Sequence, residues 1–365
     1  YSSAFKQELA KGNRRYKIHL VITFENGSTI DVFNDQIWEG TFSIEDATST
    51  SGNLDVGTFS ASKLKCTLNN MYGDFDEYDF YMAKIGAYVG LDLEDGTTEY
   101  ELVGNFTVDN PQYNGSTISI SANDNFYKFN QFKFDDCPVD YPITTDMLVA
   151  SICDYVDCDY VSPQLSYSYT IESKPSDGFT CAQMISFIAQ IHGKFAKIDR
   201  NGRLYFKWYA LPSTEIDPQF EIDSTFALNT YTSDLSVTGV RVECRSKESD
   251  YEVIPYLAGS EGYVVEISNN PLISTNAQAQ EVALLLKENA FKSFVFRPLN
   301  GTILSDPSIE SGDSGTIMDW KGVTYKFFVS TRSFKVGNSE SISCDAETPL
   351  TKTQNIVSHT PNSVV

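Results

Sequence analysis

Hydrophobic and polar residues alternate over much of the chain, and this period of two is typical of half-buried β-strands. In the segment 16–24, every second residue is apolar or aromatic. The Asn26-Gly27 pair and a second strand-like run, 28–33, follow at once, which predicts a β-hairpin with the positive φ angles of a type I′ turn. The same pattern recurs around three further pairs: Asp95-Gly96, Asn114-Gly115 and Asn201-Gly202. Antiparallel β structure is therefore expected to dominate the first ~130 residues.

Few segments have the 3.6-residue period of an amphipathic helix. A short amphipathic stub is expected at 5–11, and Thr144 or Thr145 can cap a helix that runs to about Tyr155. Asp146 would lie in the first turn of that helix, where a negative charge is favourable.

Two later helices begin with a threonine and a glutamine at the spacing of a capping box. The pairs are Thr180 with Gln183 and Thr275 with Gln278. The first of these helices is expected to end at Gly193 and to lead directly into a hairpin.

Two distant segments, 90–121 and 315–343, follow a similar order of strands and turn glycines. Each has a strand, a glycine turn, a second strand with a phenylalanine, and another glycine nine positions after that phenylalanine, followed by a Ser/Ile strand. The residues concerned are Gly96, Phe106 and Gly115 in the first segment and Gly322, Phe328 and Gly337 in the second. The pattern predicts either two related β-barrels within one chain or two ordinary hairpins that are alike by chance.

These observations predict an α+β fold that is mainly β, with two tube-like antiparallel β-barrels and a small α/β region between them. We expect the first barrel at 1–133, the α/β region at 134–222, and the second barrel, with a helix near 276–290, at 223–350. A polar tail is expected at 351–365.

The charge of the chain is strongly negative, with 49 acidic and 27 basic residues and a net charge of -22. Such a chain repels the phosphates of nucleic acid rather than binding them tightly. Two interpretations stay open: the charge serves solubility alone, or it belongs to a wall past which DNA slides without sticking.

The seven cysteines are odd in number and include no CxxC pair, which indicates a reducing compartment and small buried hydrophobic side chains. No apolar run reaches the ~18 residues that a membrane span needs, so a soluble protein is expected. No secretory signal is visible at the N-terminus.

Residues that could carry chemistry are sparse. Cys181 and His192 are expected at opposite ends of one short helix, too far apart for a Cys-His hydrolase. Neither an HExxH zinc motif nor a phosphate-binding glycine loop is present, so we expect no metal and no cofactor. The acidic residues are too numerous for a catalytic carboxylate pair to be singled out.

One acidic stretch, 74–79, is a candidate site. It is predicted to be a solvated loop facing a lumen or a neighbouring subunit, with a cation site as the alternative, although it lacks EF-hand spacing. The candidate residues are Asp74, Asp76, Glu77 and Asp79.

A set of short motifs, taken in order over ~300 residues, resembles the baseplate hub family of phage tails, which includes prophage tail proteins and the N-terminal hub region of tail-associated lysins. The motifs are Arg14-Arg15-Tyr16, the run 104–108, the helix 184–193 with the hairpin around Asn201-Gly202, the run 269–273, Arg297-Pro298, Asp306-Pro307 and Gly312-Asp313.

The resemblance implies a non-catalytic structural hub that closes the distal end of a tail tube. It implies a homotrimer in which each subunit supplies two barrels, so that a three-fold tip fits a six-fold tube and DNA passes without specific binding. The implied partners are the tail tube or a distal tail ring and the tape-measure protein, in a virion tail assembled in the host cytoplasm. The alternatives are a tail-associated peptidoglycan hydrolase and a carbohydrate-binding host-attachment module. Whether a lysin or fibre region follows the hub stays open.

Overall fold

The structure is a computed structural model that describes residues 1–49, 54–163, 165–176, 178–210, 221–222, 227–231, 233–245, 252–337, 339–345 and 355–357. The fold is mainly β, with several antiparallel sheets, which confirms that part of the predicted fold class. No helix among these residues is long and apolar enough to cross a membrane.

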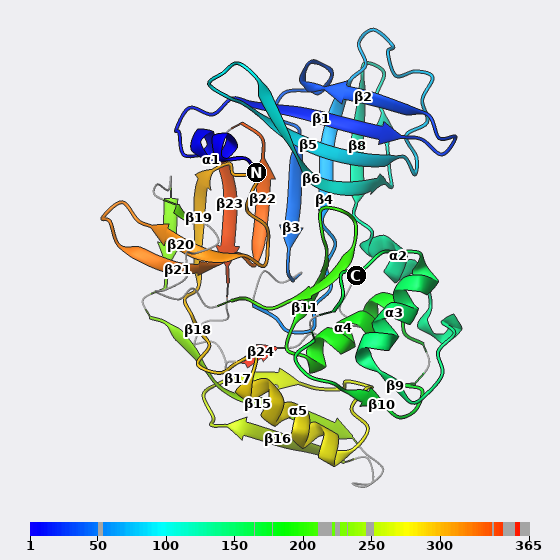
Figure 1. Ribbon diagram of the computed structural model, residues 1–365, viewed down its shortest axis with the longest axis vertical. Helices are drawn as coiled ribbons and strands as arrows, with labels where there is room; N and C mark the ends of the chain where they lie inside the picture. The colour runs from blue at the N-terminus through cyan, green and yellow to red at the C-terminus, as the bar shows by residue number, and fades with distance from the viewer. Residues whose placement is uncertain are drawn as a thin grey trace.

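The largest sheet has twelve strands from both ends of the chain, in the order β14-β19-β23-β22-β3-β4-β8-β6-β5-β1-β2, with β7 paired to β8. In Figure 1 its blue and cyan strands form the upper right of the molecule and its orange strands the left. The strands are β1 (Tyr16–Thr23), β2 (Thr29–Phe33), β3 (Ser43–Ala47), β4 (Lys63–Asn69), β5 (Lys84–Asp92), β6 (Thr98–Val108), β7 (Gln112–Tyr113), β8 (Thr117–Asn123), β14 (Ala227–Thr230), β19 (Leu299–Leu304), β22 (Thr331–Lys335) and β23 (Ser339–Cys344).

The two halves of this sheet join where β3 pairs antiparallel with β22. We call β1 to β8 the first half and β14, β19, β22 and β23 the second half. Phe334 on β22 lies opposite Ile44 on β3 and is buried in the hydrophobic core of the first half. An isolated bridge between Ile37 and Leu68 also brings the chain after β2 back to β4, so the first half curls. These pairings do not establish two closed barrels.

The hairpin turns differ from the type I′ turn predicted at Asn26-Gly27. Gly27 has a φ of 80°, whereas Asn26 is not among the residues with positive φ. The Gly27 amide donates to the Phe24 carbonyl, and the Phe24 amide donates to the Ser28 carbonyl. This is a three-residue turn followed by a glycine bulge, in which only the glycine needs the left-handed conformation. The turns at Gly96, Gly202 and Gly322 have the same pattern.

The two similar segments share local hydrogen bonds as well as turn glycines. The first segment and the residues just before it share three bonds: the Met82 amide donates to the Val108 carbonyl, the Val108 amide to Ala83, and the Asp109 amide to Ser121. At the second segment and just before it, the Gly312 amide donates to Val329, the Val329 amide to Asp313, and the Ser330 amide to Ser343. Met82 and Gly312 also share a positive φ, of 58° and 93°. The likeness therefore extends to backbone geometry, beyond the order of residues in the sequence.

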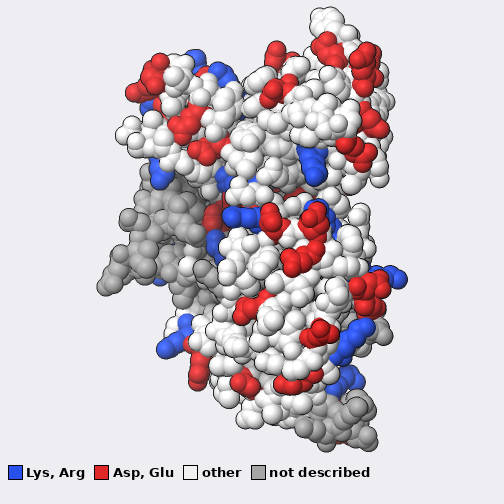
Figure 2. All heavy atoms as spheres, turned by 45° about the vertical axis from the view of Figure 1, so that its right-hand side comes forward, with Lys and Arg blue, Asp and Glu red and all other residues white. Residues whose placement is uncertain are grey.

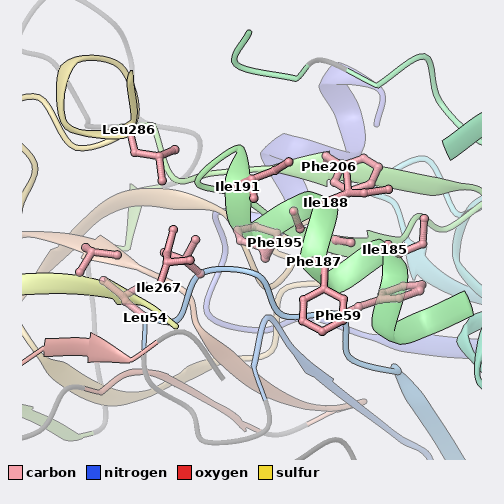
Figure 3. Close-up of a cluster of buried hydrophobic side chains, with 14 of the residues drawn as sticks. Leu54, Phe59, Ile185, Phe187, Ile188, Ile191, Phe195, Phe206, Ile267 and Leu286 are labelled. Carbon is pink, nitrogen blue, oxygen red and sulfur yellow. The ribbon is translucent and has the colours of Figure 1, made fainter. Parts of the chain in front are cut away.

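The middle of the chain forms helices, one short hairpin and a two-stranded sheet of distant strands around a second, larger core (Figure 3). Phe187 and Ile188 on one helix and Phe195 on the next strand are at most 3% exposed. The elements are α2 (Phe126–Gln131), η2 (Phe134–Asp136), β9 (Ile143–Thr144), α3 (Thr145–Val156), β10 (Thr170–Ile171), α4 (Cys181–Ile191), β11 (Phe195–Ile198) and β12 (Leu204–Lys207). This core also includes side chains of the second half, so the two regions fold against each other.

The remaining strands form two smaller sheets, and a helix covers one of them at the bottom of Figure 1. The helix α5 (Asn276–Glu288) packs on β15 (Leu235–Arg245) and β16 (Val253–Gly259). The other elements are β13 (Glu221–Ile222), β17 (Tyr263–Ile267), β18 (Val295–Phe296), β20 (Ser314–Met318), β21 (Thr324–Phe328), β24 (Asn355–Val357), and, near the N-terminus, α1 (Ser3–Leu9) and η1 (Asn34–Gln36).

The predicted helix starts are confirmed. Thr144 caps α3, and complete capping boxes begin α4 and α5 at Thr180 and Thr275. The predicted N-terminal stub is α1, whereas the six-residue α2 has too short a pattern to be found from the sequence. The predicted domain boundaries stay a proposal, and most of the predicted tail lies outside the described residues.

Candidate functional site

The four predicted acidic residues are exposed in the loop between β4 and β5: Asp74, Asp76, Glu77 and Asp79. The neighbouring Phe75 and Phe80 are buried in the core of the first half and fix the loop to it. Asn70 holds the loop from within, because its Nδ2 donates to Asp76 Oδ1 (2.8 Å) and its Oδ1 accepts from the Phe75 amide (2.9 Å). Among the described residues no group of three or more His, Cys, Asp or Glu could hold a metal ion. A lumen-facing or neighbour-facing role stays a prediction.

Exposed aromatic and apolar side chains lie in and beside this loop, and they were missed in the sequence. Met71 and Tyr72 are 65% and 87% exposed, and Tyr81 and Tyr113 are 57% and 52% exposed. The hydroxyl of Tyr113 accepts from the Phe80 amide (3.0 Å), so β7 and the acidic loop are tied together. The signal was present as Met-Tyr and Tyr-Met pairs flanking the acidic stretch. Such a surface fits contact with another protein better than exposure to water.

A buried ionic cluster joins the first half, the middle region and the loop between β19 and β20, and the sequence patterns did not predict it. Lys197 on β11 forms an ion pair with Asp46 on β3, and both side chains are less than 10% exposed. Lys197 also donates to the Ser311 hydroxyl, and the Ser311 amide donates to Asp46 Oδ2 (2.8 Å). Burial alone would raise the pKa of Asp46, but the Lys197 ammonium and the Ser311 hydrogen bonds hold it well below its usual range.

Asp124, at the end of β8, is a second buried carboxyl in this cluster. Its Oδ2 accepts from the Ser62 amide (2.7 Å) and its Oδ1 from the Phe126 amide (3.0 Å). Burial raises the pKa of Asp124 to about 7, and the nearby Asp46 charge acts in the same direction. The small cavity between these groups has a volume of about 30 Å³, space for about one water molecule.

Arg332 and Glu340 form a further buried pair across the β22–β23 hairpin, with 3.0 Å between Nη2 and Oε2. Arg332 also donates to the Asp306 carbonyl (2.6 Å). Burial raises the pKa of Glu340 to about 7, although the arginine opposes this shift. The second carboxyl oxygen, Oε1, is buried without a hydrogen-bond partner in the described structure.

Arg200, in the β11–β12 turn, connects the middle region to the first half and to the loop between β19 and β20. Its side chain forms an ion pair with Glu310 and donates to the Pro307 carbonyl (2.7 Å). The backbone carbonyl of Arg200 accepts from Asn105 Nδ2 on β6 (2.8 Å). One residue thus contacts the first half and the loop that leads into β20.

We call the region where the first half, the middle region and the loop between β19 and β20 meet the junction. Several motifs that carry the family resemblance make contacts near the junction or hold other parts of the fold together. Arg14 donates to the Ser305 carbonyl (2.7 Å), and the Tyr16 hydroxyl donates to the same carbonyl. Asn270, from the run 269–273, donates to the Phe187 carbonyl of α4 (3.0 Å). That run also lines an open pocket of about 720 Å³ at the start of α5. The motifs therefore hold the parts of the chain in place, and the structure gives a physical reason for their residue types.

The Cys-His pair is not arranged for catalysis. Cys181 begins α4 and His192 caps its other end, about 16 Å away along an 11-residue helix. Burial raises the pKa of the Cys181 thiol to about 12 and lowers the pKa of His192 to about 3. A nucleophilic cysteine needs the opposite shift, toward the thiolate. All seven cysteines are buried free thiols, which confirms their predicted role as core residues.

Charge is unevenly distributed over the surface. Figure 2 shows carboxylates spread over much of the visible face, with lysines and arginines in smaller groups. The outward face of β3, β4, β8, β22 and β23 differs, because most of its residues are serine, threonine or asparagine. Its charged residues are Glu45, Lys63, Lys65 and Lys335, and Lys65 pairs with Glu45 at 2.9 Å.

At the level of sequence, no protein-family profile and no curated protein matches this chain. Solved structures do match its fold. A tail protein from Neisseria meningitidis has a TM-score of 0.57 and 11% identity, over 89% of this chain and 95% of that protein. A 43 kDa tail protein of a Shewanella oneidensis prophage has a TM-score of 0.54 and 14% identity, over 89% and 97%. A prophage tail protein from Listeria monocytogenes has a TM-score of 0.54 and 12% identity, over 91% and 96%. At these identities the likeness shows a common fold over nearly the full length of each chain.

Proposed function

We propose, from a fold shared with phage tail proteins, that this chain is a non-catalytic structural subunit of a phage-type tail. In this proposal it is the hub that closes the distal end of the tail tube. The motifs of the sequence and the likeness in fold both point to tail proteins. The match covers almost the whole chain, so it is not explained by one common hairpin or domain.

The observation that carries the hub proposal is one sheet that runs through two similar halves of a single chain. A ring closes only when the rotation that relates one subunit to the next is a full turn divided by a whole number. Three copies with two similar halves each would present six similar modules. A three-fold hub could then dock on a six-fold tube without a mismatch of symmetry.

The outward face of β3, β4, β8, β22 and β23 fits a passage for DNA in this ring. Most of its groups are hydroxyls and amides, which form no ion pairs with phosphate, and Glu45 and Lys65 neutralise each other. Lys63 and Lys335 add two positive charges to this face. The net charge of -22 on each chain opposes tight binding over longer distances. DNA would slide past such a surface without a specific contact.

The acidic loop and its exposed aromatic residues would then face the passage or a neighbouring protein. The partners in this proposal are the tail tube or a distal tail ring, and the tape-measure protein held before ejection. The location is the virion tail, after assembly in the host cytoplasm.

Mass in solution tests the proposal directly. We expect the purified chain to have about three times its subunit mass of 40.8 kDa by light scattering coupled to size exclusion. A subunit that stays monomeric up to millimolar concentration would contradict the ring. Lysis of peptidoglycan by the isolated chain in a zymogram would contradict the non-catalytic role.

A further inference from the structure

We infer that neighbouring copies in the ring pair β7 of one copy with β14 of the next, in the antiparallel arrangement that joins β22 to β3 inside one chain. This inference rests on the proposed function and names the contact that the ring would use. It follows from comparing the strand order and register of the two halves.

Both halves contain the same row of four strands. In the first half β3 pairs with β4, β4 with β8, and β8 with β7; in the second half β14 pairs with β19, β19 with β23, and β23 with β22. The hairpins β7–β8 and β22–β23 turn at Gly115 and Gly337, which both have positive φ. Thus β7 corresponds to β22, and β14 corresponds to β3.

One of these rows meets the other inside the chain. The outer edge of β22 pairs with the outer edge of β3 over five residues. The equivalent edges, on β7 and β14, have no strand partner in the part of the chain that the structure describes. In a ring of similar modules, the contact between copies repeats the contact within a copy, and these two edges are the ones left to form it.

The register identifies which residues would face each other. Gln112 of β7 lies opposite Ser119 of β8, and Ser333 of β22 lies opposite Ser341 of β23. Ser119 and Ser341 are equivalent, because each follows its turn glycine by the same number of residues. Gln112 and Tyr113 therefore correspond to Ser333 and Phe334.

On the other edge, Leu64 of β4 lies between Ile44 of β3 and Ala122 of β8. In the second half, Leu299 of β19 lies in the same way between Thr230 of β14 and Cys344 of β23. Thr230 therefore corresponds to Ile44, and Tyr231 to Glu45. The predicted facing pairs between copies are Tyr113 with Thr230 and Gln112 with Tyr231.

Tyr113 provides an independent reason for a missing neighbour. Its counterpart Phe334 is completely buried at the contact between the halves, whereas Tyr113 is 52% exposed. Burying an aromatic ring at a strand edge contributes both apolar area and cross-strand packing. A second copy placed as β3 is placed on β22 would supply the cover that this ring lacks.

Pro111 limits the same edge to a specific partner. It corresponds to Arg332 in β22, and it has no amide hydrogen to donate. A short edge with a proline pairs weakly on its own, which protects the free chain from open-ended aggregation. Closure of a ring would offset this weakness by adding all three contacts at once.

The test is a disulfide between copies, with Gln112→Cys and Tyr231→Cys in one full-length chain. Facing residues of an antiparallel pair have Cα atoms about 4.5–5.5 Å apart, within the range of disulfides. The natural cysteines are all buried, so the engineered pair should react first. Mild oxidation should give a covalent species of about three times 40.8 kDa on a non-reducing gel, and a reductant should convert it back to single chains.

Two controls define the result. Each single variant can form no more than a covalent dimer. Gln112→Cys combined with Thr324→Cys places the second thiol on an exposed residue of β21, outside the proposed contact, and should give no covalent trimer.

The outcomes separate the inference from the function on which it rests. A trimer by mass that does not cross-link in the double variant would overturn the contact and leave the ring. A monomer by mass would overturn both.

Discussion

Buried ion pairs between distant residues hold the parts of this chain together. Lys197 and Asp46 come from the middle region and the first half, and their ion pair is almost fully removed from water. Replacing one member of such a pair leaves the other charge buried and unpaired, which typically costs about 3–5 kcal/mol. We therefore expect Lys197→Met to lower the free energy of unfolding by about that amount, measured by urea denaturation.

A matched control for this variant is Lys65→Met, since Lys65 forms an exposed pair with Glu45. Exposed pairs contribute about 0–1 kcal/mol, so this change should have little effect. Equal losses in the two variants would show that the buried pair has no special role.

Asp124 should make stability depend on pH in a way that a single substitution removes. Its pKa is raised from 3.8 to about 7, so the folded chain holds a proton that the unfolded chain releases. Between about pH 4 and 7, raising the pH therefore destabilises the folded state through this group, by at most about 1.4 kcal/mol per pH unit. Asp124→Asn cannot lose this proton. Its stability relative to the parent protein should rise between pH 5 and 7 and then level off.

Urea denaturation of both proteins at pH 5, 6, 7 and 8 measures this difference. The opposite contribution of His192, whose lowered pKa favours folding as the pH rises, is present in both proteins and cancels. A difference in stability that stays constant from pH 5 to 8 would contradict the assignment.

At the scale of elements, the glycine before β20 is tightly constrained by its backbone conformation and by a buried ring. Gly312 has a φ of 93°, and an added Cβ would lie 2.6 Å from the ring of the fully buried Phe195. The left-handed conformation costs a residue with Cβ about 1–2 kcal/mol, and the clash adds about 1–3 kcal/mol. Gly312→Ala should lower the midpoint of thermal unfolding clearly. Gly27→Ala is the control, because it has a similar φ and open space around it, and should cost only the first part.

Local elements were predictable from the sequence and the distant pairings were not. The capping boxes at Thr180 and Thr275 and the turn at Gly27 depend on residues at most four positions apart, so the residue types determine them. The type I′ turn was nevertheless wrong, since a glycine bulge needs only one residue with positive φ.

The contacts at the junction could not be predicted from such local patterns. Lys197 and Asp46 are 151 residues apart, and β3 and β22 nearly 300, so no local period links them. The family resemblance did point to residues there, such as Asp306-Pro307, without saying what they contact.

At the scale of the whole molecule, Tyr113 tests whether the free edge of β7 is a contact. Tyr113→Asp places a charge where the neighbouring copy would bury a ring, and burying an unpaired charge is strongly unfavourable. We expect this variant to fall from about three subunits to one by light scattering, with an unchanged circular dichroism spectrum. Tyr113→Phe removes only the hydroxyl that accepts from the Phe80 amide, so it should lose a little stability and keep the ring.

Tyr72→Asp is the matched control for charge, because Tyr72 is 87% exposed in the same region but lies outside β7. It should stay trimeric. If both Asp variants dissociate, added negative charge on a subunit already at -22 explains the result, and the edge does not. If neither dissociates, the ring does not depend on Tyr113. Only dissociation confined to Tyr113→Asp fits a ring whose copies meet as the two halves of one chain already do.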